Sequence, residues 1–135
     1  MEIRKEPLEI SLFSLRVTIF FVMLVWTLDK FINPDHAAKV YENFYFIGGL
    51  GNSALYIVGG IELIILVGFL LGIYKNFTYG AVLVFHALST LSSFKQYLTP
   101  YDGHHLLFFA AWPMLAGCLV LFLLREYDSK YICSI

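Results

Sequence analysis

One apolar stretch decides the fold: residues 53–74 read SALYIVGGIELIILVGFLLGIY and contain a single charged side chain, Glu62. A helix that crosses a membrane needs about 20 mainly apolar residues, and this stretch has that length. A charge inside a membrane is costly, so such a residue usually faces the interior of a helix bundle and has a partner there. The stretch therefore predicts a membrane-spanning helix that turns Glu62 toward its neighbours.

The composition of the whole chain agrees with this interpretation. Of the 135 residues, 59% are hydrophobic and 14% are charged, whereas soluble domains average about 45–50% and about 25%. The net charge is −1 and no basic run is present, which excludes a nucleic-acid-binding protein because that class needs a positive surface. The length predicts one domain, residues 1–135. We therefore expect a small integral membrane protein in contact with membrane lipids.

Four stretches are long and apolar enough to cross a membrane. The expected spans are residues 10–32, 53–74, 77–98 and 105–125. Short turns separate the last three, and short turns make neighbouring helices antiparallel. The prediction is an all-α protein, a four-helix transmembrane bundle with both termini on one side. Five Lys and Arg residues near the span ends lie on that side and three on the other, which favours cytoplasmic termini in a bacterial inner (cytoplasmic) membrane.

The connection between the first two spans predicts a further, short helix. Asn33 and Pro34 stop the first span and begin a new helix. After them Val40 and Phe44 recur at helical spacing, with polar residues on the opposite face. Residues 35–47 therefore predict an amphipathic helix that lies in the membrane interface.

Three ionisable residues fall inside the expected spans: Arg16, Glu62 and His86. At about 1.5 Å per residue they lie about 9, 18 and 13 Å from the same membrane edge. We expect an Arg16–Glu62 charge pair with His86 close by, neutral because desolvation disfavours the cation. In a catalytic interpretation, this cluster binds and protonates a substrate. In a structural interpretation, the pair only stabilises the bundle, and His86 bonds a neighbouring backbone or hydroxyl group.

Other polar and aromatic side chains gather toward the outer ends of the spans. On the third span His86, Ser93 and Gln96 share one helical face, as their spacing requires. Such a face predicts hydrogen bonds between helices or the wall of a polar cavity. A polar cluster is expected at the outer end, made of Asp29, Lys30, Lys95, Gln96, Asp102, His104 and His105.

The sequence predicts no metal site. His104 and His105 are adjacent, so they point about 100° apart on a helix and rarely bind one ion together. The alternative is haem or copper bound by one of them together with His36 or His86. The two cysteines form no CxxC motif, which counts against a dithiol or disulfide function.

Several motifs carry a resemblance to a known family. They are Leu15-Arg16, Trp26-x-x-x-Lys30-Phe31, Gly59-Gly60-Ile61-Glu62-Leu63 and Leu70-Leu71-Gly72-Ile73-Tyr74-Lys75. Over roughly residues 11–125 the chain resembles the DoxX-like family of small four-helix membrane proteins. Phe20-Phe21 and the His104-His105 pair depart from the family's pattern, which leaves the ligand open.

The resemblance implies a small membrane subunit linked to respiratory or quinone redox chemistry, since some members are membrane subunits of a thiosulfate:quinone oxidoreductase. The quinone ring would lie against Trp26 and Trp112, with Lys30 and Gln96 beside it. Glu62, His86 and Arg16 would bind the quinone oxygens and carry protons. The chain has no flavin, haem or iron–sulfur motif, so an enzyme of this kind would take its electrons from another protein subunit. Two alternatives stay open: a non-catalytic accessory subunit of a larger membrane complex, and a membrane protein that binds a hydrophobic ligand or a metal.

Overall fold

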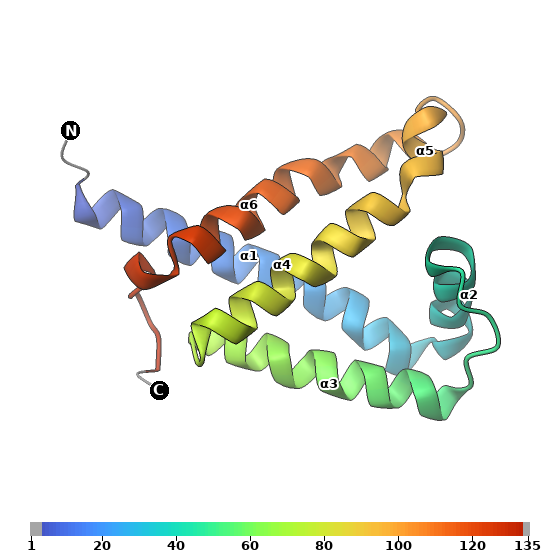
Figure 1. The fold of residues 1–135 in the computed structure, drawn as a ribbon, viewed down its shortest axis with the longest axis horizontal. Helices are drawn as coiled ribbons and strands as arrows, with labels where there is room; N and C mark the ends of the chain where they lie inside the picture. The colour runs from blue at the N-terminus through green and yellow to red at the C-terminus, as the bar shows by residue number, and fades with distance from the viewer. Residues whose placement is uncertain (1–3, 134–135) are drawn as a thin grey trace.

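The computed structural model describes residues 4–133, and every regular element within this range is a helix (Figure 1). The prediction of an all-α protein is therefore confirmed. The elements are, in chain order, α1 (Lys5–Ile32), α2 (Pro34–Tyr45), α3 (Asn52–Leu71), α4 (Lys75–Ser92), α5 (Phe94–Leu98), the 3₁₀ helix η1 (His105–Ala110), α6 (Ala111–Leu123) and the 3₁₀ helix η2 (Arg125–Tyr127). Within residues 4–133, three helices are long and apolar enough to cross a membrane: α1, α3 and the continuous helix formed by η1 and α6.

Residues that cannot continue a helix set the first boundaries. Asn33 leaves the helical region with φ −138°, and Pro34 follows it in the first turn of α2, where the missing N–H of proline costs nothing. Gly72 ends α3 in the left-handed conformation with φ 70°. A side chain at Gly72 would also run into Ile132.

The predicted span 77–98 is interrupted at Ser93, where α4 ends and α5 begins. The hydroxyl groups of Ser92 and Ser93 both donate to the carbonyl of Ser89. Such bonds compete with the regular backbone bonds of a helix and bend it. The helix break therefore falls at Ser93, which also belongs to the polar face predicted for this span.

The long helices pack as two antiparallel pairs, α1 with α3 and α4 with α6. Helix α1 also contacts α6 where Gly117 meets the side chains of Leu15 and Ile19. In Figure 1 the two pairs meet at the end that carries the start of α1 and the α3–α4 turn, and they diverge toward the end that carries α2. We call these ends the terminal end and the α2 end.

The hydrophobic core explains why the pairs meet at the terminal end. Its residues come from the halves of the long helices that lie nearest that end, whereas large apolar side chains on the outer faces stay exposed. The buried core consists of Leu12, Ile19, Phe20, Ile65, Leu66, Phe69, Tyr79, Val82, Cys118 and Leu121.

Candidate functional site

The most deeply buried charges form an ion pair at the terminal end. Arg16 on α1 and Asp128, which follows η2, are both fully buried. The Arg16 Nη1 atom lies 2.7 Å from Oδ1 of Asp128, and the Tyr79 hydroxyl donates to the second carboxylate oxygen at 2.5 Å. A buried cation is stable only when it is paired and hydrogen-bonded, and the C-terminal residues of the chain supply that partner.

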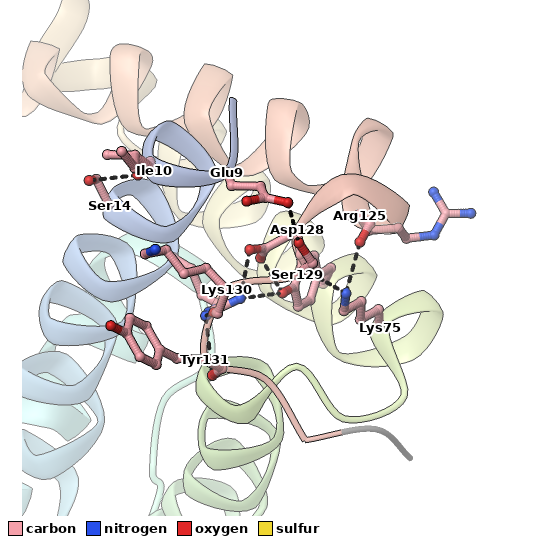
Figure 2. A network of polar contacts seen from close by, with 11 residues as sticks. Glu9, Ile10, Ser14, Lys75, Arg125, Asp128, Ser129, Lys130 and Tyr131 are labelled. Carbon is pink, nitrogen blue, oxygen red and sulfur yellow. Dashed lines mark hydrogen bonds and ion pairs between the residues drawn. The ribbon is translucent and has the colours of Figure 1, made fainter. Parts of the chain in front are cut away.

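The tail that carries Asp128, residues 125–133, is held by further contacts (Figure 2). Nη2 of Arg16 donates to the backbone carbonyl of Lys130. The Lys75 ammonium group donates to the carbonyl of Arg125 at 3.0 Å and to that of Asp128. The hydroxyl of Ser129 donates to Glu9 on α1 at 2.9 Å. The tail therefore ties α1, α4 and α6 together at the terminal end.

A second ion pair lies toward the α2 end, between α1 and α3. The Lys30 ammonium group lies 2.9 Å from Oε2 of Glu62, and the Thr27 hydroxyl donates to the same oxygen at 3.2 Å. The Tyr41 ring of α2 lies 5.6 Å from the Lys30 nitrogen. Burial, and then the nearby Glu62 carboxylate, raise the pKa of the Tyr41 hydroxyl above its ordinary value, so this group stays protonated.

The predicted Arg16–Glu62 charge pair is wrong: Asp128 pairs with Arg16, and Lys30 pairs with Glu62. The reason is the register of α1 on α3. Thr27 contacts Glu62 in this antiparallel pair. Arg16 lies eleven residues before Thr27 on α1, which is about 16 Å along the helix axis at about 1.5 Å per residue. The depths expected from the sequence were counted from the end of each span, as if all spans began at the same depth in the membrane. That assumption brought Arg16 and Glu62 closer together than the helix register allows.

The third member of the predicted cluster, His86, is bound elsewhere. Its Nε2 atom lies 2.9 Å from the carbonyl oxygen of Ala111 on α6. A carbonyl only accepts, so Nε2 carries the proton and donates. The structural interpretation of His86, a bond to a neighbouring backbone group, is confirmed, and the three-residue cluster is not formed.

The four residues predicted to hold a ring lie in different surroundings. Lys30 is engaged by Glu62, and Trp26 is exposed on α1. Trp112 is half-exposed and packs on Tyr97, with ring centroids 5.5 Å apart. The Gln96 side-chain oxygen is buried and has no hydrogen-bond partner among the described residues. The ring-binding function of these residues stays a prediction.

His36 and His105 have local partners, and only the second belongs to the expected outer cluster. His36 Nδ1 lies 2.6 Å from the Asp29 carboxylate. His105 Nδ1 lies 2.8 Å from the backbone oxygen of Thr99. Within residues 4–133, no three His, Cys, Asp or Glu side chains are close enough together to hold a metal ion.

The structure adds one central residue that the sequence analysis missed. Asp128 follows the last span in the charged segment 125–130, which reads as a solvated tail. The only signal was indirect, since Arg16 needs a buried acidic partner. An open cavity of about 790 Å³ also lies beside the tail, between the α3–α4 turn and Ile132 with Cys133.

Chemically, both ion pairs are neutral units whose members are hydrogen-bonded to the chain itself. The Lys30–Glu62 pair is the less enclosed of the two, because 19% of the Glu62 side chain is exposed and Arg16 and Asp128 are sealed. Comparison of the chain with protein-family models, with curated proteins and with solved structures finds no match.

Proposed function

We propose that the chain is an integral membrane protein in which four helices cross the bilayer: α1, α3, α4 and the η1–α6 helix. Three of them have the required length and composition. Helix α4 packs against both α3 and α6, and its 18 residues span about 27 Å, close to the roughly 30 Å of the hydrocarbon layer. The amphipathic helix α2 then lies in the interface away from the termini, which are cytoplasmic in a bacterial inner membrane.

Within the membrane the chain acts as a non-catalytic accessory subunit of a larger complex. The observation that carries this proposal is the pairing of its buried charges: Arg16 with Asp128 and Lys30 with Glu62. A catalytic proton relay needs ionisable groups that exchange protons with a substrate, whereas these four charges are neutralised by one another within the chain. The apolar outer faces of the spans are available to lipids and to other membrane subunits.

Gentle extraction tests the accessory function. The chain is tagged at its N-terminus, because the C-terminal tail is packed against α1 and α4. Native mass spectrometry in a mild detergent is expected to find it in a fixed ratio with other membrane proteins. A chain that leaves the membrane alone, or only with copies of itself, contradicts the proposal.

The resemblance to the DoxX-like family supports a second proposal, a subunit that handles a quinone. The observation in its favour is the pair of donors to Glu62, namely Lys30 and Thr27, with the Tyr41 ring beside the Lys30 nitrogen. A quinone carbonyl needs such donors. Reduction of the quinone to a quinol takes two electrons, which another protein subunit would supply, and two protons, which would reach the ring from the aqueous phase through Glu62. Quinone-linked turnover in membranes is expected to fall with Glu62→Gln and to survive His86→Ala. Unchanged turnover in Glu62→Gln removes this proposal.

A further inference from the structure

Helix α2 lies at the end where the two helix pairs diverge (Figure 1) and contacts helices of both pairs. On one side its Tyr41 ring lies under the Lys30 ammonium group at 5.6 Å. On the other side the ring of Phe44 stacks on Phe108 of η1, with centroids 5.8 Å apart. Lys95 of α5 lies 5.5 Å from the ring of Phe46, the residue that follows α2. Few side chains therefore hold the α2 end closed, compared with the continuous core at the terminal end.

The helix itself is weakly anchored. Of its twelve residues only Ala37 is buried. Both connections are irregular: Asn33 leaves the helical region before α2, and residues 46–51 form no helix. Gly49 adopts φ 75° with open space where a side chain would lie. Short irregular connections of this kind are where hinge rotation is absorbed.

Helix α2 lies beside the buried ion pair between α1 and α3. Thr27 and Lys30 are buried, and Glu62 accepts from both. Without α2, the Tyr41 side would be open and water would reach the ion pair. Loops and helices that gate polar sites are drawn from the least stable parts of a structure.

We propose that α2 is a hinged lid that opens the Lys30–Glu62 pair to the aqueous phase at the α2 end. In the closed state Tyr41 covers the pair and Phe44 fastens the lid to η1. In the open state the contact between Phe44 and Phe108 is lost and the lid swings on residues 46–51. This opening of α2 involves only helices of this chain, so it does not depend on whether the chain has partner subunits.

Cysteine labelling tests the lid in the full chain, purified in detergent. The reporter is Thr27→Cys in a Cys133→Ser background, because Cys133 is exposed and Cys118 is buried. A water-soluble maleimide is expected to label the reporter slowly. Phe44→Ala is expected to raise the labelling rate at least about tenfold, since one aromatic pair is lost. A disulfide formed between Phe44→Cys and Phe108→Cys is expected to lower the rate below that of the reporter alone. Its reduction is expected to raise the rate to that of Phe44→Ala, because the aromatic pair is then absent.

The matched control is Phe13→Ala, which removes an aromatic contact with Tyr131 at the terminal end and is expected to leave the rate unchanged. A rate that is unaffected by Phe44→Ala and by the disulfide overturns the proposal. Hydrogen exchange of the unmodified chain gives a second readout that needs no substitution. Amides of α2 are expected to exchange at least about tenfold faster than those of α3, and equal protection of the two helices overturns the lid as well.

Discussion

At the scale of single residues, Lys30 and Glu62 illustrate how the chain accommodates charge among apolar helices. Their side chains meet at 2.9 Å across α1 and α3 and are mostly buried. Removing one member of such a pair leaves an uncompensated charge, which costs more than removing both. The function of the pair therefore shows in the difference between single and double substitutions.

Lys30→Met is expected to lower the free energy of unfolding by about 3 kcal/mol, and Glu62→Gln by a smaller amount, because it removes the charge but keeps a hydrogen-bonding group. The double substitution is expected to recover most of the loss. The control is Lys39→Met, an exposed position of α2 where the change stays within about 0.5 kcal/mol. Thermal unfolding in detergent measures all four variants. Losses in the double variant that equal the sum of the single losses contradict the pairing.

At the scale of the helices, close contact between α1 and α3 depends on a glycine. A side chain at Gly59 would come within 2.8 Å of the Phe31 ring, whereas Gly60 has open space. The Phe31 ring itself stacks on Tyr56 of α3, with centroids 5.8 Å apart. Gly59 is therefore needed for the packing of α1 on α3, whereas Gly60 is not.

Gly60→Ala is expected to stabilise the chain by about 0.5–1 kcal/mol, since alanine favours a helix over glycine. Gly59→Ala has the same propensity gain but displaces the Phe31 ring, and a net loss of about 1 kcal/mol is expected. The two melting temperatures in detergent are compared directly. Equal stabilisation by both substitutions would show that α1 does not approach α3 at Gly59.

Helix α2 gives a pH dependence through Tyr41, whose pKa is raised by burial and by the Glu62 carboxylate. In the unfolded chain this tyrosine ionises near its ordinary pKa of about 10. The folded state holds the proton to higher pH, so its contribution to stability is present below about pH 10 and falls as the pH rises further. Melting curves between pH 8 and 11 are expected to show this fall.

The Tyr41→Phe variant isolates this contribution. Its stability is expected to fall less steeply above about pH 10 than that of the unmodified chain. Tyr101→Phe is the control, because Tyr101 is 88% exposed, and its pH profile is expected to match the unmodified chain. Identical profiles for Tyr41→Phe and the unmodified chain would place Tyr41 in water.

At the scale of the whole molecule, two different devices close the ends of the helix pairs. The C-terminal tail closes the terminal end by burying Asp128 against Arg16. Helix α2 bridges the other end with a few aromatic contacts. The Arg16–Asp128 pair is fully buried, whereas α2 is held by a few aromatic contacts. We therefore expect the terminal end to be rigid and the α2 end to open.

The sequence predicts the positions of the helices well and the partners of the buried charges poorly. Helix positions follow from apolar runs and from breakers such as Pro34 and Gly72, so the predicted spans lie within a few residues of most observed helices. Partners of Arg16 and Glu62 depend on the register between helices and on a tail distant in sequence. Asp128 lies 112 residues after Arg16 in the chain, and no local pattern joins them.

The central claim is that the buried charges are neutralised within this chain, and the Arg16–Asp128 pair tests it most directly. The measurement is a double-mutant cycle of Arg16→Met and Asp128→Asn, followed by thermal unfolding in detergent. Each single substitution is expected to cost about 3–5 kcal/mol, and the double variant is expected to be more stable than Arg16→Met or Asp128→Asn alone. Additive losses, with no coupling between the two positions, would contradict the pairing and leave Arg16 free for a partner or a ligand.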